Sequence, residues 1–133
     1  MLGKLEKMTP SERWKFWIDE LSPCIKCYAC RAACPMCYCA RCTVDFNQPQ
    51  WIPVPSHELG NLEWHFMRAV HLTGRCIDCD ACFNACPLAI PLNLLTKKMI
   101  EDVKMNFGGY QPFLKGEHLM STYKPDDKEN FIQ

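Results

Sequence analysis

The chain has 133 residues, with 15 basic and 15 acidic side chains and a formal net charge of zero. This length suits one domain of ordinary size, and the neutral balance gives no support to a nucleic-acid partner, which would require a basic excess. No apolar stretch approaches the roughly 20 residues of a membrane span.

The cysteine content, 11 residues, calls for either disulfides or metals. The odd number argues against a complete disulfide framework. Residues 1–8 carry charges where a secretion signal would be apolar. We therefore expect a cytoplasmic location, where thiols stay reduced and are available to metals.

The first predicted element is a helix over residues 9–21. Thr9 is suited to cap it, Pro10 to occupy its first position, and Glu12 to complete a capping box. Four apolar side chains follow at helical spacing and share one face: Trp14, Trp17, Ile18 and Leu21. We expect residues 1–22 to pack against the rest of the chain, or alternatively to dock on a partner.

A cysteine run follows this helix and occurs twice. The spacing Cys-x2-Cys-x2-Cys-x3-Cys-Pro is found at Cys24, Cys27, Cys30, Cys34 and Pro35, and again at Cys76, Cys79, Cys82, Cys86 and Pro87. This spacing is typical of [4Fe–4S] clusters in bacterial ferredoxins, where the fourth cysteine of each run ligates the other run's cluster. The sequence thus predicts two clusters with crossed ligands.

The predicted ligand sets follow from this crossing. The first cluster takes Cys24, Cys27, Cys30 and Cys86, and the second takes Cys76, Cys79, Cys82 and Cys34. Zinc is the alternative, but zinc sites need only two Cys-x2-Cys pairs, and the triple spacing that ends in Cys-Pro exceeds that requirement.

Three further cysteines, Cys37, Cys39 and Cys42, extend the first run. They have three interpretations: thiols packed near the cluster as small apolar groups, a third metal site or cluster, or a replacement for Cys34 as ligand. Among the histidines, His57 is the best-placed additional ligand.

The charges around the two runs also differ. Lys26 and Arg31 flank the first run, whereas Asp78 and Asp80 lie inside the second. Positive charge favours the more reduced, more negative form of a cluster, so we expect the first cluster to have the higher reduction potential.

Two more helices are predicted, over residues 57–73 and 91–107, the former opened by Ser56. Its predicted buried side holds Leu59, Leu62, Phe66, Ala69, Val70 and Thr73. Residues 45–56 contain three prolines and should be extended. No segment alternates apolar and polar residues, so we predict a mainly α fold, with a dicluster domain at 23–109 and a polar tail at 110–133.

These features resemble a known family. The two runs, their helical separation and the segment LeuAlaIleProLeu at 88–92 are similar to α-helical ferredoxin modules of heterodisulfide reductase, RnfC-type and succinate or fumarate enzymes. Residues 23–39 also look like the iron–sulfur region of formate dehydrogenase and F420-hydrogenase beta-type subunits, and the segment 71–98 looks like the same dicluster group.

The resemblance implies an electron-transfer subunit of an anaerobic oxidoreductase, with no catalytic site of its own and with two crossed [4Fe–4S] clusters between helices. Its partners would be catalytic or flavin-containing subunits, since no Gly-x-Gly-x-x-Gly fingerprint is present. The alternatives are a freely diffusing dicluster ferredoxin, which the neutral charge disfavours, and a zinc-binding adaptor.

Overall fold

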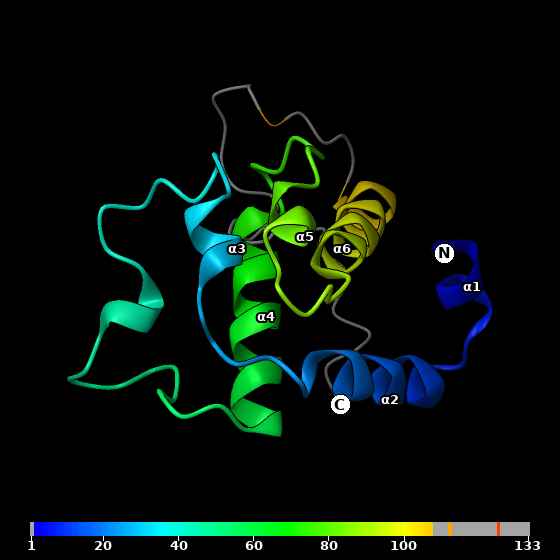
Figure 1. The fold of residues 1–133 in the computed structure, drawn as a ribbon. Helices are drawn as coiled ribbons and strands as arrows, with labels where there is room; N and C mark the ends of the chain where they lie inside the picture. The colour runs from blue at the N-terminus through cyan, green and yellow to red at the C-terminus, as the bar shows by residue number, and fades with distance from the viewer. Residues whose placement is uncertain (1, 108–111, 113–124, 126–133) are drawn as a thin grey trace.

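The computed structural model describes residues 2–107 together with Pro112 and Pro125, and these residues are mainly helical, as predicted (Figure 1). No β-strand occurs among them. None of their helices has the length and apolar character that a membrane span needs. The predicted polar tail from residue 110 lies outside the described residues, apart from the two prolines.

The three predicted helices are confirmed to within two residues at each end. They are α2 (Pro10–Leu21), α4 (Glu58–Leu72) and α6 (Leu92–Phe107). Four short helices were not predicted: α1 (Leu2–Lys7), α3 (Ala29–Ala32), the 3₁₀ helix η1 (Thr43–Asp45) and α5 (Ala81–Asn84). The longest of these has six residues, too few for a periodic pattern to develop.

Local capping explains where α2 and α4 begin. The predicted capping box of α2 is present: Glu12 N–H donates to Thr9 Oγ1 at 3.3 Å, and Thr9 N–H donates to Glu12 Oε2 at 2.7 Å. The predicted cap of α4 was wrong, because His57 Nδ1 accepts the Gly60 N–H at 3.2 Å. Ser56 instead donates its hydroxyl to the Cys24 carbonyl.

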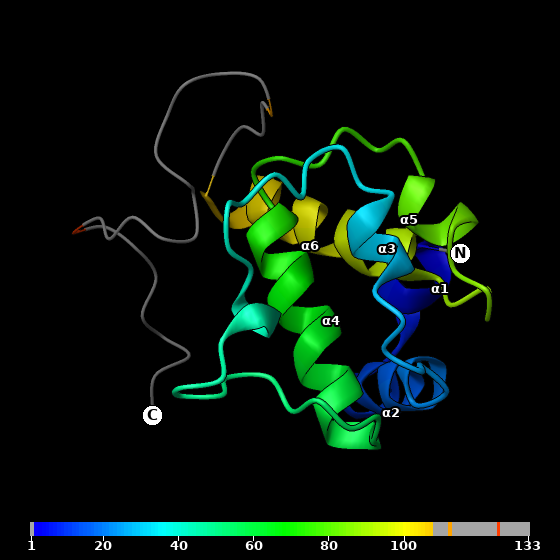
Figure 2. The same cartoon turned by 60° about the vertical axis from the view of Figure 1, so that its left-hand side comes forward.

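Helix α4 is the central element and packs on both α2 and α6 (Figures 1 and 2). The apolar core forms where these helices meet and includes Trp17, Leu21, Leu62, Ala69, Leu92 and Leu95. The predicted apolar face of α2 is only partly buried, since Trp14 remains 51% exposed. Its ring centroid lies 6.2 Å from that of Phe66 on α4.

The buried side of α4 also carries polar residues that the apolar pattern did not indicate. Asn61, His65 and Arg68 are all buried, whereas Leu59, predicted to be inside, is 66% exposed. Burial and the nearby cations lower the pKa of His65 to about 4, so its imidazole is neutral at pH 7. Asn61 Nδ2 donates to the carbonyls of Ser22 and Cys24, at 3.0 and 2.8 Å.

We expect Asn61→Ala to lower the free energy of unfolding by about 1–3 kcal/mol, because it leaves two carbonyls without their donor. Anaerobic urea unfolding of the full chain measures this. Asn106→Ala is the matched control, since it removes an exposed amide that also donates to a carbonyl. Equal effects of the two substitutions would contradict the structural role of Asn61.

Candidate metal centre

The two cysteine runs adopt the same backbone conformation. In the first, Lys26 and Tyr28 have φ angles of 52° and 57°, and in the second, Asp78 and Asp80 have φ angles of 59° and 57°. Residues other than glycine seldom adopt this left-handed region, and each such residue costs about 1–3 kcal/mol. The same strain at equivalent positions indicates that both loops are shaped for a common purpose.

The two loops also share their hydrogen bonds. Lys26 N–H donates to Cys24 Sγ at 3.3 Å, and Asp78 N–H donates to Cys76 Sγ at 3.4 Å. Each loop then enters a single turn of helix, α3 or α5, and these two helices lie side by side (Figure 2). Amide donors to sulfur favour the thiolate, the form that binds metal.

The structure brings together the cysteines of the predicted second set. Cys76, Cys79 and Cys82 line one cavity, and Cys34 from the other run lines it with them. We call this the four-cysteine cavity. The cavity thus joins cysteines of both runs, which is the placement that the predicted crossing requires.

The thiols of the predicted first set are also neighbours. Burial raises the pKa of Cys24, and the nearby thiols of Cys27 and Cys86 raise it further. Burial likewise raises the pKa of Cys30 to about 11, with Cys24 adding to the effect. Cys86, although 62 residues along the chain from Cys24, thus lies beside the first run.

No three His, Cys, Asp or Glu side chains of the described residues converge closely enough to hold a single metal ion. An iron–sulfur cubane places its thiolates on four separate iron atoms, so its ligands lie farther apart than those around one zinc ion. The predicted second set lines one cavity, and ligands spread around a shared space are what a cubane needs.

Two side chains of helix α4 hold the first loop by donating hydrogen bonds to the backbone carbonyls of that loop. Asn61 binds the Cys24 carbonyl, and two turns later Arg68 Nη2 donates to the Cys30 carbonyl at 3.0 Å. Arg68 is only 4% exposed, and its Nε has no hydrogen-bond partner among the described residues. The loop is thereby fixed to the helix at its first and third cysteines.

The Arg68 guanidinium lies among thiols rather than carboxylates. Within residues 2–107 no salt bridge joins it to an acidic side chain. Burial raises the pKa of the Cys82 thiol, and Arg68 opposes this through its charge and a hydrogen bond. The composition of the sequence could not indicate this residue, because an arginine on a helix is usually exposed.

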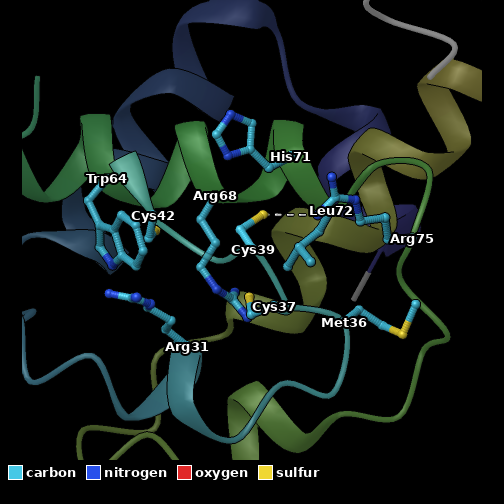
Figure 3. A pocket seen from close by; sticks show the side chains of 10 residues that line it. All are labelled: Arg31, Met36, Cys37, Cys39, Cys42, Trp64, Arg68, His71, Leu72 and Arg75. Atoms are coloured by element: carbon cyan, nitrogen blue, oxygen red, sulfur yellow. Dashed lines mark hydrogen bonds between the residues drawn. The ribbon is translucent and has the colours of Figure 1, made fainter. Parts of the chain in front are cut away.

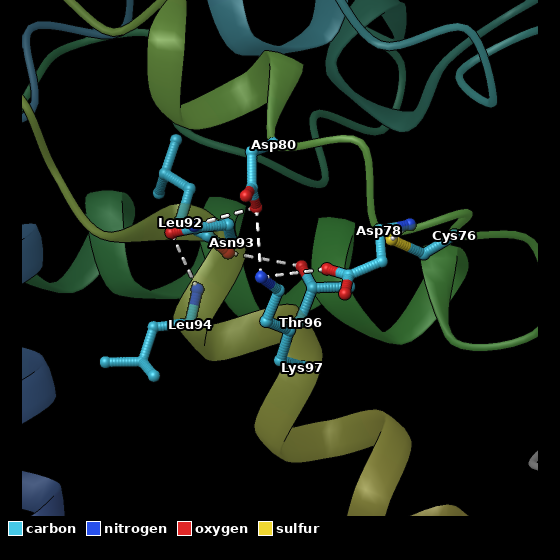
Figure 4. Close-up of polar contacts among 8 residues, drawn as sticks. All are labelled: Cys76, Asp78, Asp80, Leu92, Asn93, Leu94, Thr96 and Lys97. Atoms are coloured by element: carbon cyan, nitrogen blue, oxygen red, sulfur yellow. Dashed lines mark hydrogen bonds and ion pairs between the residues drawn. The ribbon is translucent and has the colours of Figure 1, made fainter. Parts of the chain in front are cut away.

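Helix α6 holds the second loop by side-chain contacts (Figure 4). Lys97 Nζ forms ion pairs with Asp78 and Asp80, at 3.0 and 3.1 Å. Asn93 Nδ2 donates to Asp80 Oδ1 at 2.9 Å, and these hydrogen bonds from Asn93 and Lys97 lower the pKa of Asp80. The acidic residues of the second loop are therefore partly neutralised.

The additional cysteines share a cavity of their own, although the Cys37 thiol also contacts Cys34. Cys37, Cys39 and Cys42 line a second cavity, which we call the three-cysteine cavity (Figure 3). Cys34 lines the four-cysteine cavity and Cys37 does not. This favours Cys34 over Cys37 as the predicted ligand.

We expect Lys97→Met to loosen the second loop and, if the loop binds iron, to speed the loss of that iron to a chelator about two- to five-fold, in line with the modest strength of exposed ion pairs. Lys98→Met is the matched control, because Lys98 pairs with Asp102 on the same helix, away from the cysteines. Iron release followed by absorbance measures both, and equal rates would contradict the role of Lys97.

Comparison with known proteins gives related sequences but no matching family model. The F420-dependent formate dehydrogenase subunit beta of Methanocaldococcus jannaschii is 34% identical over 108 residues, which are 78% of this chain and 26% of that protein. The F420-dependent formate dehydrogenase 1 subunit beta of Methanococcus maripaludis is 44% identical over 39 residues, 28% of this chain and 10% of that protein. The chain thus spans about a quarter or less of these relatives, and its sequence is similar to part of a formate dehydrogenase beta subunit.

Proposed function

We propose that this chain holds two [4Fe–4S] clusters and relays single electrons within a larger oxidoreductase complex, without a catalytic site of its own. The observation that carries this proposal is the shared cavity of Cys34 with Cys76, Cys79 and Cys82, which joins the two repeated loops. Such clusters accept and donate one electron at a time. The chain's own residues would hold the clusters close together and shape their surroundings.

The similarity to beta subunits supports a place between a flavin or iron–sulfur donor and a catalytic subunit. A formate-oxidising subunit is the first partner to test, and a reducing cytoplasm is the compartment that suits the free thiols. The zero net charge favours a bound subunit over a diffusing ferredoxin, which would gain from a strong acidic field.

Metal analysis of the anaerobically purified full chain tests the proposal. The protein should be brown and contain at least about eight irons and eight sulfides. A colourless zinc protein would favour the adaptor alternative instead. Co-purification of the native complex, followed by formate-dependent bleaching of the clusters, would then identify the partner.

Cysteine variants test the crossed ligands. We expect Cys34→Ser to alter the cluster signal that Cys79→Ser removes, and Cys86→Ser to alter the signal that Cys27→Ser removes. Electron paramagnetic resonance of the reduced proteins measures this. If Cys34→Ser instead altered the Cys27-dependent signal, each run would hold its own cluster and the crossing would be wrong.

Arg68 should set the reduction potentials. We expect Arg68→Met to move the midpoint of at least one cluster to a more negative value, because a buried positive charge stabilises the more reduced, more negative state. Arg68→Lys retains the positive charge and should move the midpoint potential less. Anaerobic redox titration measures both.

The control for this titration is Arg13→Met, which removes a guanidinium that donates to the Met8 carbonyl within the N-terminal segment. An Arg68→Met protein with normal iron content and an unchanged midpoint would contradict the electrostatic role.

The structure weakens the argument that the first cluster has the higher reduction potential. The charges on which that argument rests are paired: Arg31 pairs with Asp45, and Lys97 neutralises Asp78 and Asp80.

A further inference from the structure

The three additional cysteines line one cavity beside the predicted second cluster site, where the Cys37 thiol also contacts Cys34. Cys37, Cys39 and Cys42 come from the segment after α3 and line one cavity against α4 (Figure 3). Cys39 is exposed, and the other two are half-buried. They therefore do not fill the apolar core, which is the role that a buried free cysteine usually has.

Specific contacts fix the segment that carries these thiols. Arg31 forms a two-pronged ion pair with Asp45, at 2.9 and 2.8 Å, and Asp45 Oδ2 accepts the Cys42 N–H at 3.1 Å. On the other side, Arg75 Nη1 donates to Cys39 Sγ at 3.2 Å. Cys42 is thus tied to α3 through Asp45, and Cys39 is tied to Arg75 in the segment after α4.

The lining of the cavity complements negative charge. The guanidinium groups of Arg31, Arg68 and Arg75 border it, and Arg75 is oriented toward a thiol. Three thiolates around one metal centre carry a negative charge that needs such neighbours. Arg31 also pairs with Asp45, and Arg68 also holds the Cys30 carbonyl, so together with Arg75 they place three anchored positive charges beside the thiols.

We propose that Cys37, Cys39 and Cys42 hold a third iron–sulfur cluster. A cluster suits the site better than a single ion, because the three thiols face one cavity, yet no three metal-ligand side chains in the described part of the chain converge as they would around zinc. This inference rests on the proposed function, since it requires a chain that is loaded with iron and sulfide.

The third site would adjoin the second cluster. Met36, Arg68 and Leu72 line both the three-cysteine and the four-cysteine cavity, so one layer of side chains separates them. A relay with three centres in contiguous positions would carry electrons farther across the subunit than two centres can. The cationic Arg68 would border both of these centres.

The test is the iron content of the anaerobically purified full chain and of a triple variant, Cys37→Ser with Cys39→Ser and Cys42→Ser. We expect about twelve irons in the unmodified chain and about eight in the variant, which should keep the paramagnetic signals of the other two clusters. Cys27→Ser is the control: it should lower the iron content while leaving the third signal intact.

Equal iron contents of about eight in the unmodified chain and the triple variant would overturn the third cluster and leave the proposed function standing. One zinc per chain that is lost in the triple variant would also overturn it, in favour of a single ion. Absence of iron from the unmodified chain would overturn both proposals. If the triple variant fails to fold, the iron content of the unmodified chain decides, at about twelve or about eight.

Discussion

The hydrogen bonds from α4 to the carbonyls of the first cysteine loop organise this protein. Asn61 and Arg68 bind the Cys24 and Cys30 carbonyls from one helix face, and they are about 10 Å apart along the axis because seven residues separate them. A loop with left-handed residues at Lys26 and Tyr28 could not hold its shape alone. The helix supplies the donors that make the strained loop a fixed element.

The second loop has the same left-handed backbone positions as the first, but ion pairs hold it in place of hydrogen bonds to its carbonyls. Asp78 and Asp80 adopt the left-handed conformation and are held by Lys97 of α6. The two halves then meet through α3 and α5, which bring Cys34 to the cavity of the second run. The repeated cysteine spacing thus gives two loops with the same backbone conformation. The first loop is held by α4 and the second by α6.

Much of this organisation can be predicted from the sequence, because it depends on the spacing of cysteines and of apolar residues. The cysteine intervals indicate two loops, and apolar periodicity with Thr9 and Glu12 indicates α2. The sequence pattern could not show which residues far apart in the chain come into contact. Asn61 and Arg68 interrupt the apolar pattern of α4 and would ordinarily be assigned to its exposed side, yet loop carbonyls that arrive from elsewhere in the chain make them buried. The sequence predicts His57 as an additional ligand, whereas its Nδ1 caps helix α4.

The two loops are held by different interactions, so their rigidity should respond differently to the salt concentration. Ion pairs between exposed groups weaken as ionic strength rises, whereas buried amide-to-carbonyl hydrogen bonds hardly respond. Lys97, Asp78 and Asp80 are all partly exposed, but Asn61 is fully buried. Salt would therefore loosen the second cysteine loop while leaving the first loop rigid.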